Sequence, residues 1–177
     1  MQNQKKPSIT KRTRSHYHQG NFKPQHPEKY IGNPTNIIYR SKWELMFLKW
    51  ADSNASVLKY SSEECVIPYI SPIDGKQHRY FMDFFLQVMC QDGTVKSYLV
   101  EVKPYAQTQP PKISKKKTVM SESYQEELKT YMINQAKWAA AKRVCDKHGW
   151  EFMIITEKQL FRKRNHANTK KQSKKSS

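Results

Sequence analysis

Apolar residues recur at helical spacing early in the chain. Their i, i+3, i+4, i+7 pattern predicts an amphipathic helix over about residues 36–52, and Asn54 with its neighbouring serines is typical of a helix end. We therefore expect this stripe to face the protein core. The stripe consists of Trp43, Met46, Phe47 and Trp50.

A second helical pattern lies in the C-terminal half and predicts a helix over about residues 123–148. Gly149 follows directly and suits the left-handed residue that ends many helices. The pattern places Gln135 on the apolar face, where an apolar residue would be expected. That face consists of Tyr124, Leu128, Tyr131, Met132, Trp138 and Ala139.

Between the two helices, residues 57–103 are rich in β-forming residues. Two Asp-Gly turns divide this run into strands that we expect to form an antiparallel meander. Pro104 ends the last strand because proline has no backbone donor, and residues 151–156 predict a further strand. Helix, antiparallel strands, helix and strand predict an α/β fold, a mixed sheet flanked by helices. The strands of the meander are Cys65–Ile70, His78–Met89 and Thr94–Lys103.

The chain has 177 residues, 37% of them apolar, which suits one domain with a real core. No run approaches the ~18 apolar residues of a membrane-spanning helix, and the polar start has no signal-peptide core behind it. Membrane insertion and secretion are therefore not expected.

Cys65, Cys90 and Cys145 lack CxxC spacing, which favours free thiols in a reducing compartment. His16 and His18 have no second ligand pair for a metal.

The net charge of +17 is concentrated at the two ends of the chain. Residues 1–30 hold seven basic and one acidic residue, residues 161–177 hold seven basic and none acidic, and residues 31–160 are nearly balanced. We therefore predict a basic extended arm, a folded domain over 31–160 and a basic disordered tail. Clustered cations favour nucleic acid because binding releases its counterions. The candidate contacts to its backbone are Lys11, Arg12, Arg14, Lys112, Lys115, Lys116 and Lys117.

Strand alternation places Glu101 and Lys103 on one face of the predicted strand 94–103. Alone, these two residues could form a weak surface ion pair. Asp83 changes this interpretation, because it lies within an aromatic strand. A lone carboxylate is costly to bury there unless it is paired or binds a cation.

The position of Asp83 relative to Glu101 depends on the hairpin between their strands. A two-residue Asp92-Gly93 turn would pair Asp83 with Val102 and place the two carboxylates on opposite faces. A three-residue Gln91–Gly93 loop, with its glycine left-handed, would pair Asp83 with Glu101, their Cβ atoms about 5 Å apart. Two carboxylates in that register need a cation, and Mg²⁺ usually binds one or two carboxylates together with substrate phosphate.

Asp83, followed by Glu101-Val102-Lys103 on the next strand, resembles the PD-(D/E)xK nuclease family, with a helical Glu44 before and a helical Gln135 after. The family's usual proline before the aspartate is Met82 here. From the residues alone, Glu44 could face solvent or the interior, and Gln135 could be a boundary residue. The resemblance implies a restriction-endonuclease-like core in which Glu44 completes the outer metal shell and Gln135 positions water or phosphate.

The resemblance also implies the remaining roles. Asp83, Glu101 and the carbonyl of Val102 would bind Mg²⁺, for which Mn²⁺ would substitute. Lys103 would orient or deprotonate the attacking water and stabilise charge at the phosphate. The substrate would be double-stranded DNA, held through its backbone with little sequence preference. The candidate catalytic residues are therefore Glu44, Asp83, Glu101, Lys103 and Gln135.

A closer resemblance covers about residues 20–160 and is to the head-completion protein family of T-even-type tailed phages. That family is similar to the endonuclease subunit of a cut-and-paste bacterial transposon. The resemblance implies a late head-assembly factor that acts after DNA packaging and before tail joining, with phage head and portal-neck proteins as partners. It would work in the host cytoplasm or stay in the virion head or neck. The segments that carry the resemblance are Pro27–Tyr30, Asn33–Ser41, Trp43–Leu45, Ser61–Glu64, Ile67–Tyr69, Ser71–Asp74, His78–Phe81 and Val100–Pro104.

Two other functions stay open. The protein could be a non-catalytic plug or adaptor that binds the packaged DNA end or the portal, with the acidic pair merely structural. A general RNA- or ribosome-binding protein would explain the basic ends but not the pairing of Asp83 with Glu101.

Overall fold

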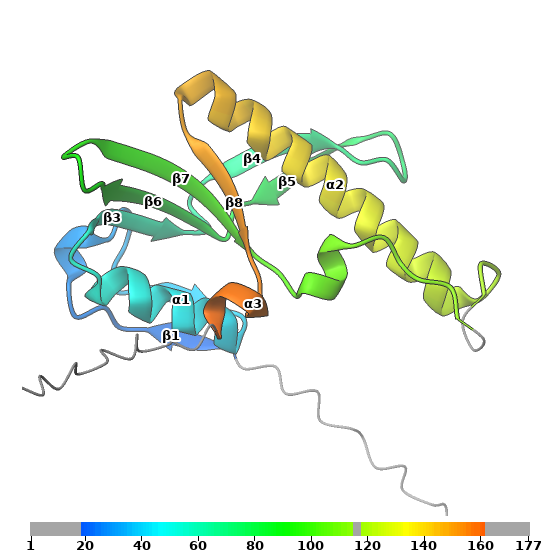
Figure 1. Ribbon diagram of the computed structural model, residues 1–177, viewed down its shortest axis with the longest axis horizontal. Helices are drawn as coiled ribbons and strands as arrows, with labels where there is room; N and C mark the ends of the chain where they lie inside the picture. The colour runs from blue at the N-terminus through cyan, green and yellow to red at the C-terminus, as the bar shows by residue number, and fades with distance from the viewer. Residues whose placement is uncertain (1–18, 115–117, 162–177) are drawn as a thin grey trace, which may run out of the picture.

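The computed structural model describes residues 19–114 and 118–161, and a four-stranded mixed sheet lies at its centre (Figure 1). β3 pairs with β6 and β6 with β7, both antiparallel, and β8 runs parallel to β7. The predicted α/β class, a mixed sheet flanked by helices, is confirmed. In sheet order the strands are β3 (Val57–Ser62), β6 (Phe84–Met89), β7 (Val95–Val102) and β8 (Glu151–Ile155).

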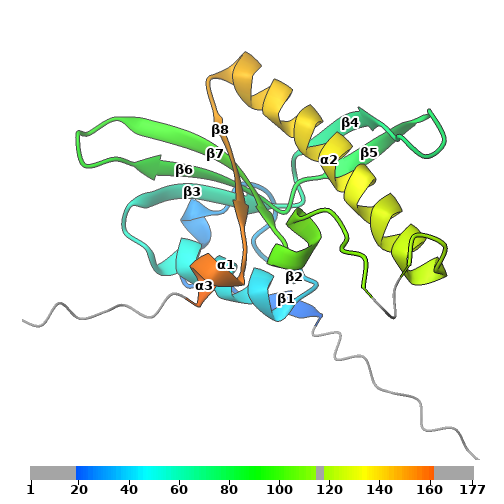
Figure 2. The same cartoon turned by 45° about the vertical axis from the view of Figure 1, so that its right-hand side comes forward.

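Helices cover both faces of this sheet (Figures 1 and 2). Side-chain alternation along β7 sends Val100 into the core under α1 with Phe47, and Leu99 into the core under α2 with Trp138. None of the helices in the described part of the chain is long and apolar enough to cross a membrane. The helices are α1 (Lys42–Ser53), α2 (Glu122–His148) and the short α3 (Glu157–Leu160).

The predicted meander strands pair antiparallel in the expected order, but they do not form one sheet, because β4 and β5 form a separate hairpin beside α2. The predicted strand 78–89 divides at Met82-Asp83, where the chain passes from one sheet to the other. The amide of Met82 donates to the carbonyl of Cys65, and the amide of Glu63 contacts the carbonyls of Met82 and Asp83. The smaller elements are β1 (Gly20–Phe22), β2 (Ile37–Tyr39), β4 (Val66–Ile70), β5 (Gln77–Phe81), η1 (Pro27–Lys29) and η2 (Tyr105–Thr108).

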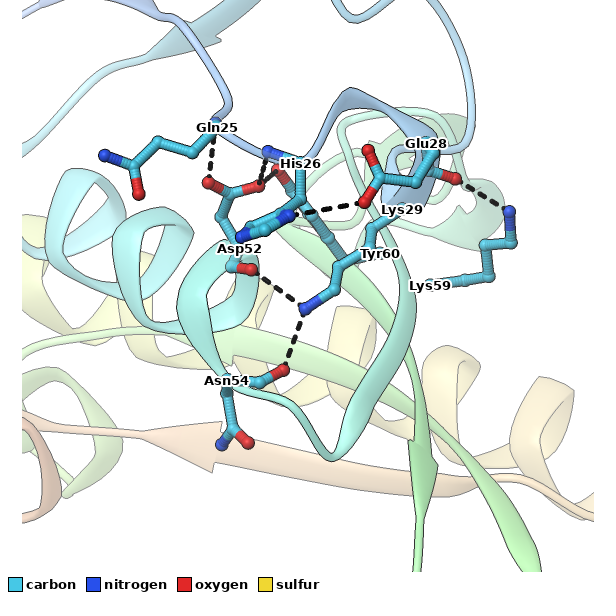
Figure 3. A network of polar contacts seen from close by, with 8 residues as sticks. All are labelled: Gln25, His26, Glu28, Lys29, Asp52, Asn54, Lys59 and Tyr60. Carbon is cyan, nitrogen blue, oxygen red and sulfur yellow. Dashed lines mark hydrogen bonds and ion pairs between the residues drawn. The ribbon is translucent and has the colours of Figure 1, made fainter.

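The predicted boundary of the N-terminal arm at residue 30 is also wrong, because residues 20–30 pack on the domain. β1 pairs with β2, and Phe22 and Tyr30 are buried in the core under α1. The carboxylate of buried Asp52 accepts hydrogen bonds from the amides of Gln25 and His26 (Figure 3). Residues 1–18 of the arm and 162–177 of the tail lie outside the described residues.

The first helix is shorter than predicted, and it buries a different face from the predicted one. Ser41 caps its N-terminus by accepting from the amide of Glu44, and β2 occupies part of the predicted helical range. Phe47 and Leu48 face the core, whereas Met46 and Trp50 are 38% and 46% exposed. Apolar residues surround most of this helix, so their spacing alone does not decide which face is buried.

Candidate active site

The hairpin between β6 and β7 has the three-residue loop Gln91–Gly93. The amide of Cys90 donates to the carbonyl of Thr94 at 2.8 Å, and the glycine has φ +79°. The register of the two strands, continued one residue beyond β6, sets Asp83 opposite Glu101. Of the two registers open from the sequence, the structure therefore has the one that brings the carboxylates to the same face.

Asp83 directly precedes β6 and is partly buried. Its Oδ2 accepts a hydrogen bond of 2.7 Å from the amide of Val102. Burial and the negative charge of Glu101 raise the pKa of Asp83 to about 8, against the opposing effects of Lys103 and the Val102 amide. Asp83 is thus held beside β7 in an environment that disfavours its negative charge.

Glu101 is 2% exposed, so its interaction with Lys103 is a buried ion pair and not a surface one. Its Oε1 lies 3.0 Å from the Lys103 ammonium, and its Oε2 accepts a 2.6 Å hydrogen bond from the hydroxyl of Tyr80. Burial lowers the pKa of Lys103, but the charges of Glu101 and Asp83 outweigh it and hold that pKa above its usual value. Both oxygens of Glu101 are therefore oriented by neighbouring side chains.

Glu44 lies at the N-terminus of α1 and faces the same cleft as Asp83. Its carboxylate accepts from the amide of Arg40 at 2.7 Å and from the hydroxyl of Ser41 at 2.9 Å, so it also helps to cap the helix. Its negative charge acts on Asp83 and Lys103. The cleft has a volume of ≈ 920 Å³ and is lined by Arg40, Ser41, Lys42, Trp43, Glu44, Asp83, Val102, Lys103, Pro104 and Gln107.

Gln135 does not lie on the buried face of α2, and the prediction that it would is wrong. Asn134, Trp138 and Ala141 form that face, whereas Gln135 is exposed on its flank.

Among the residues predicted to contact the DNA backbone, Lys112 is exposed in the connection before α2. The others, Lys11, Arg12, Arg14, Lys115, Lys116 and Lys117, lie outside the described residues.

Sequence reasoning missed three features of this region. Tyr80 reaches Glu101 from β5, a strand of another sheet, and alternation in its strand could show only that it points inward. Lys137 of α2 is partly buried, and burial and then the positive charge of Lys103 lower its pKa. At the cleft, Arg40 forms a two-point ion pair with Glu63, with distances of 2.7 and 2.9 Å.

The available ligands fit a hard divalent cation. Asp83 and Glu101 supply carboxylates beside the backbone of Val102, and within residues 19–114 and 118–161 no group of three or more His, Cys, Asp or Glu side chains forms a metal cluster. Mg²⁺ keeps several waters and takes one or two carboxylates with substrate phosphate, whereas structural zinc takes four nitrogen or sulfur ligands. Carboxylate and carbonyl oxygens are donors of the kind that Mg²⁺ takes, and the metal itself stays a prediction.

Two comparisons with known proteins gave a match. Residues 54–157 match the family described as TnsA-like endonuclease N terminal, a segment that contains the whole central sheet and α2. The chain is also 37% identical over 139 residues to the head completion nuclease of Enterobacteria phage T4, which covers 78% of this chain and 90% of that protein. No solved structure matches the chain significantly.

Proposed function

Because this chain belongs to the TnsA-like endonuclease family, we propose that it is a Mg²⁺-dependent DNA endonuclease that acts in phage head completion. The observation that carries the proposal is the convergence of Asp83 with Glu101 and Lys103 at the ends of β6 and β7. An endonuclease of this type needs two carboxylates and an ammonium group within reach of one phosphate. The cleft beside Asp83 and Lys103 gives the phosphate access.

In the proposed site, Asp83, Glu101 and the carbonyl of Val102 would hold the metal. A bound Mg²⁺ would lower the pKa of a coordinated water and neutralise charge at the phosphate. Tyr80 fixes the orientation of Glu101 through its 2.6 Å hydrogen bond. Lys103 orients the attacking water and stabilises the negative charge that develops on the phosphate oxygens. Glu44 contributes to the outer shell from the end of α1.

The double-stranded DNA substrate would be held mainly through its backbone, with exposed Lys112 and the basic ends supplying cations. Little sequence preference is expected. The relative in phage T4 bears the name head completion nuclease. We propose that this protein acts after DNA packaging and before tail joining, with head and portal-neck proteins as partners. It would act in the host cytoplasm or remain in the virion head or neck.

Cleavage of supercoiled plasmid tests the endonuclease activity. The full-length protein is incubated with EDTA, Mg²⁺ or Mn²⁺, beside Asp83→Asn, Glu101→Gln and Lys103→Met. Asp146→Asn, an exposed residue of α2, serves as the matched control. We expect nicking or linearisation only with metal, and a loss of roughly 100-fold or more in the three site variants, as for catalytic groups generally. Wild-type cleavage rates in folded site variants would refute the assignment.

A complementation assay separates the enzyme from the non-catalytic plug or adaptor. Both oxygens of Glu101 are engaged by protein groups, which a purely structural acidic pair would also show. Phage that lack this protein are supplied with the Asp83→Asn, Lys103→Met double variant. Infectious particles at the wild-type yield would favour the plug, whereas their loss with the variant still folded would favour the nuclease.

A further inference from the structure

Lys137 differs from the other lysines of its helix. α2 carries four lysines, of which Lys129, Lys142 and Lys147 are exposed and Lys137 is partly buried. It points to the side of the helix that packs on the β4–β5 hairpin and the central sheet. A lysine at such a place loses part of its hydration. Solubility therefore does not explain why a lysine occupies this position.

The ammonium of Lys137 lies above two aromatic rings, 5.4 Å from the ring centre of Tyr80 and 5.8 Å from that of Tyr69. Tyr80 is the residue whose hydroxyl donates to Glu101. The ring of Tyr80 therefore has Lys137 over its face and the Glu101 carboxylate at its hydroxyl end. Lys137 is placed beside the site from the side opposite α1.

The charges around Lys137 belong to the site. The positive charge of Lys103 and the negative charges of Glu101 and Asp83 all act on it. Yet in residues 19–114 and 118–161 no carboxylate lies within ion-pair distance of its ammonium. A cation that is partly buried over aromatic rings, and is not neutralised by an ion pair, is suited to receive an anion from outside.

The neighbouring positions of α2 are also unusually polar for a packed face. Asn134 and Trp138, three residues before Lys137 and one after it, are each 5% exposed. Asn134 Nδ2 and Trp138 Nε1 are buried donors without an acceptor in the described structure. Buried donors without acceptors destabilise the folded state, and such departures from good packing concentrate at functional sites.

We propose that Lys137 is a DNA-binding residue that contacts a backbone phosphate next to the phosphate held at Asp83, Glu101 and Lys103. The inference deepens the proposed endonuclease function and rests on it for the identity of the polyanion. Tyr69 and Tyr80 hold the lysine stem in place, and the ammonium supplies one charge to the phosphodiester. This makes α2 a second DNA-contacting element, facing the backbone from the opposite side of the site to α1.

Binding of a blunt DNA duplex at several salt concentrations tests the contact. The assay uses the full chain with Ca²⁺, to limit cleavage, and again with EDTA, and compares Lys137→Met with Lys142→Met. Methionine keeps the stem over the rings but removes the charge. Loss of one phosphate contact should flatten the slope of log K against log salt by about 0.9, whereas exposed Lys142 on the same helix should change it much less. Lys137→Arg should restore the slope.

The outcomes distinguish this inference from the enzymatic proposal. If folded Lys137→Met binds DNA with the same slope as Lys142→Met, Lys137 is only a structural counter-charge and the inference is overturned. If the slope flattens but no metal supports cleavage by the wild type, the phosphate contact stands and the endonuclease proposal falls. A flattened slope together with metal-dependent cleavage supports both.

Discussion

The hydroxyl of Tyr80 donates to Glu101 Oε2 at 2.6 Å, and both side chains are buried. Burial and the charge of Glu101 raise the pKa of Tyr80, so the phenol stays protonated and remains the donor. This bond joins the β4–β5 hairpin to the central sheet at the proposed metal site. A strand of a separate sheet, β5, thus fixes the orientation of a carboxylate carried by β7.

We expect Tyr80→Phe to fold but to lose about 1–3 kcal/mol of unfolding free energy, since a buried charged acceptor loses its donor. Cleavage should require more Mg²⁺, because Glu101 is no longer held in one orientation. Urea denaturation in EDTA and a Mg²⁺ titration of plasmid cleavage measure the two effects. Tyr98→Phe, on the opposite face of β7, is the control. An unchanged Mg²⁺ requirement would show that the hydroxyl does not orient a metal ligand.

Asp83→Asn should separate stability from activity. In EDTA at neutral pH, the variant should be more stable than the wild type by about 1 kcal/mol or more, because an amide avoids the burial and the repulsion from Glu101 that disfavour the Asp83 carboxylate. The raised pKa of Asp83 means that the wild type loses stability as the pH rises from about 4, the ordinary value, toward about 8, and the variant should lack this loss. Urea denaturation at several pH values checks both statements.

Mg²⁺ should reverse the order of stability. A ligand at 100 times its Kd stabilises the folded state by about 2.7 kcal/mol. We therefore expect Mg²⁺ to raise the melting temperature of the wild type and to leave that of Asp83→Asn nearly unchanged. Asp146→Asn should respond like the wild type. An equal rise in all three proteins would mean that the metal binds elsewhere.

Glu63 has φ +56°, in the left-handed region that a side chain with a Cβ adopts at a cost. Glycine has no such cost, so Glu63→Gly should be more stable than Glu63→Ala by about 1 kcal/mol, although both lose the ion pair with Arg40. Urea denaturation of the two variants measures this difference. If Glu63→Ala is the more stable, the left-handed conformation is not retained in solution.

Local sequence signals predicted the strand that carries Glu101 and Lys103 well. They predicted the elements that pack around this strand less well. Glu101 and Lys103 share a face because side chains alternate along any strand. The register of Asp83 stayed open between two loop lengths, since Asp-Gly suits both, and the observed pairing of Cys90 with Thr94 settles it. Short-range rules thus led to the right small set of alternatives.

The helices show where those rules fail. Apolar side chains project from nearly all sides of α1. The sequence therefore allowed a buried face with Met46 and Trp50 as readily as the observed one with Phe47 and Leu48. In α2 the buried face is shifted by about one residue from the predicted face. Asn134 and Lys137 lie on it or beside it, and Gln135 does not. Packing against another element decides the phase of a helix, and a single sequence does not contain that information.

The N-terminal segment offers the last test, since one buried side chain holds it to the domain. Asp52 accepts from the amides of Gln25 and His26 and from the hydroxyl of Tyr60 (Figure 3). Lys29 adds hydrogen bonds of 2.9 Å to the backbone carbonyls of Asp52 and Asn54 at the end of α1. The segment is therefore fixed by charge-assisted hydrogen bonds to the carboxylate of Asp52 and to the carbonyls at the end of α1.

We expect Asp52→Ala to lose about 3 kcal/mol of unfolding free energy, because two amides and a hydroxyl in this network lose a charged acceptor. Trypsin should then cut after Lys29 faster than in the wild type, while the central sheet stays resistant. Asp146→Ala, an exposed aspartate on α2, is the matched control. If Asp52→Ala shows wild-type proteolysis after Lys29, β1 and the core contacts of Phe22 and Tyr30 are enough to hold the segment.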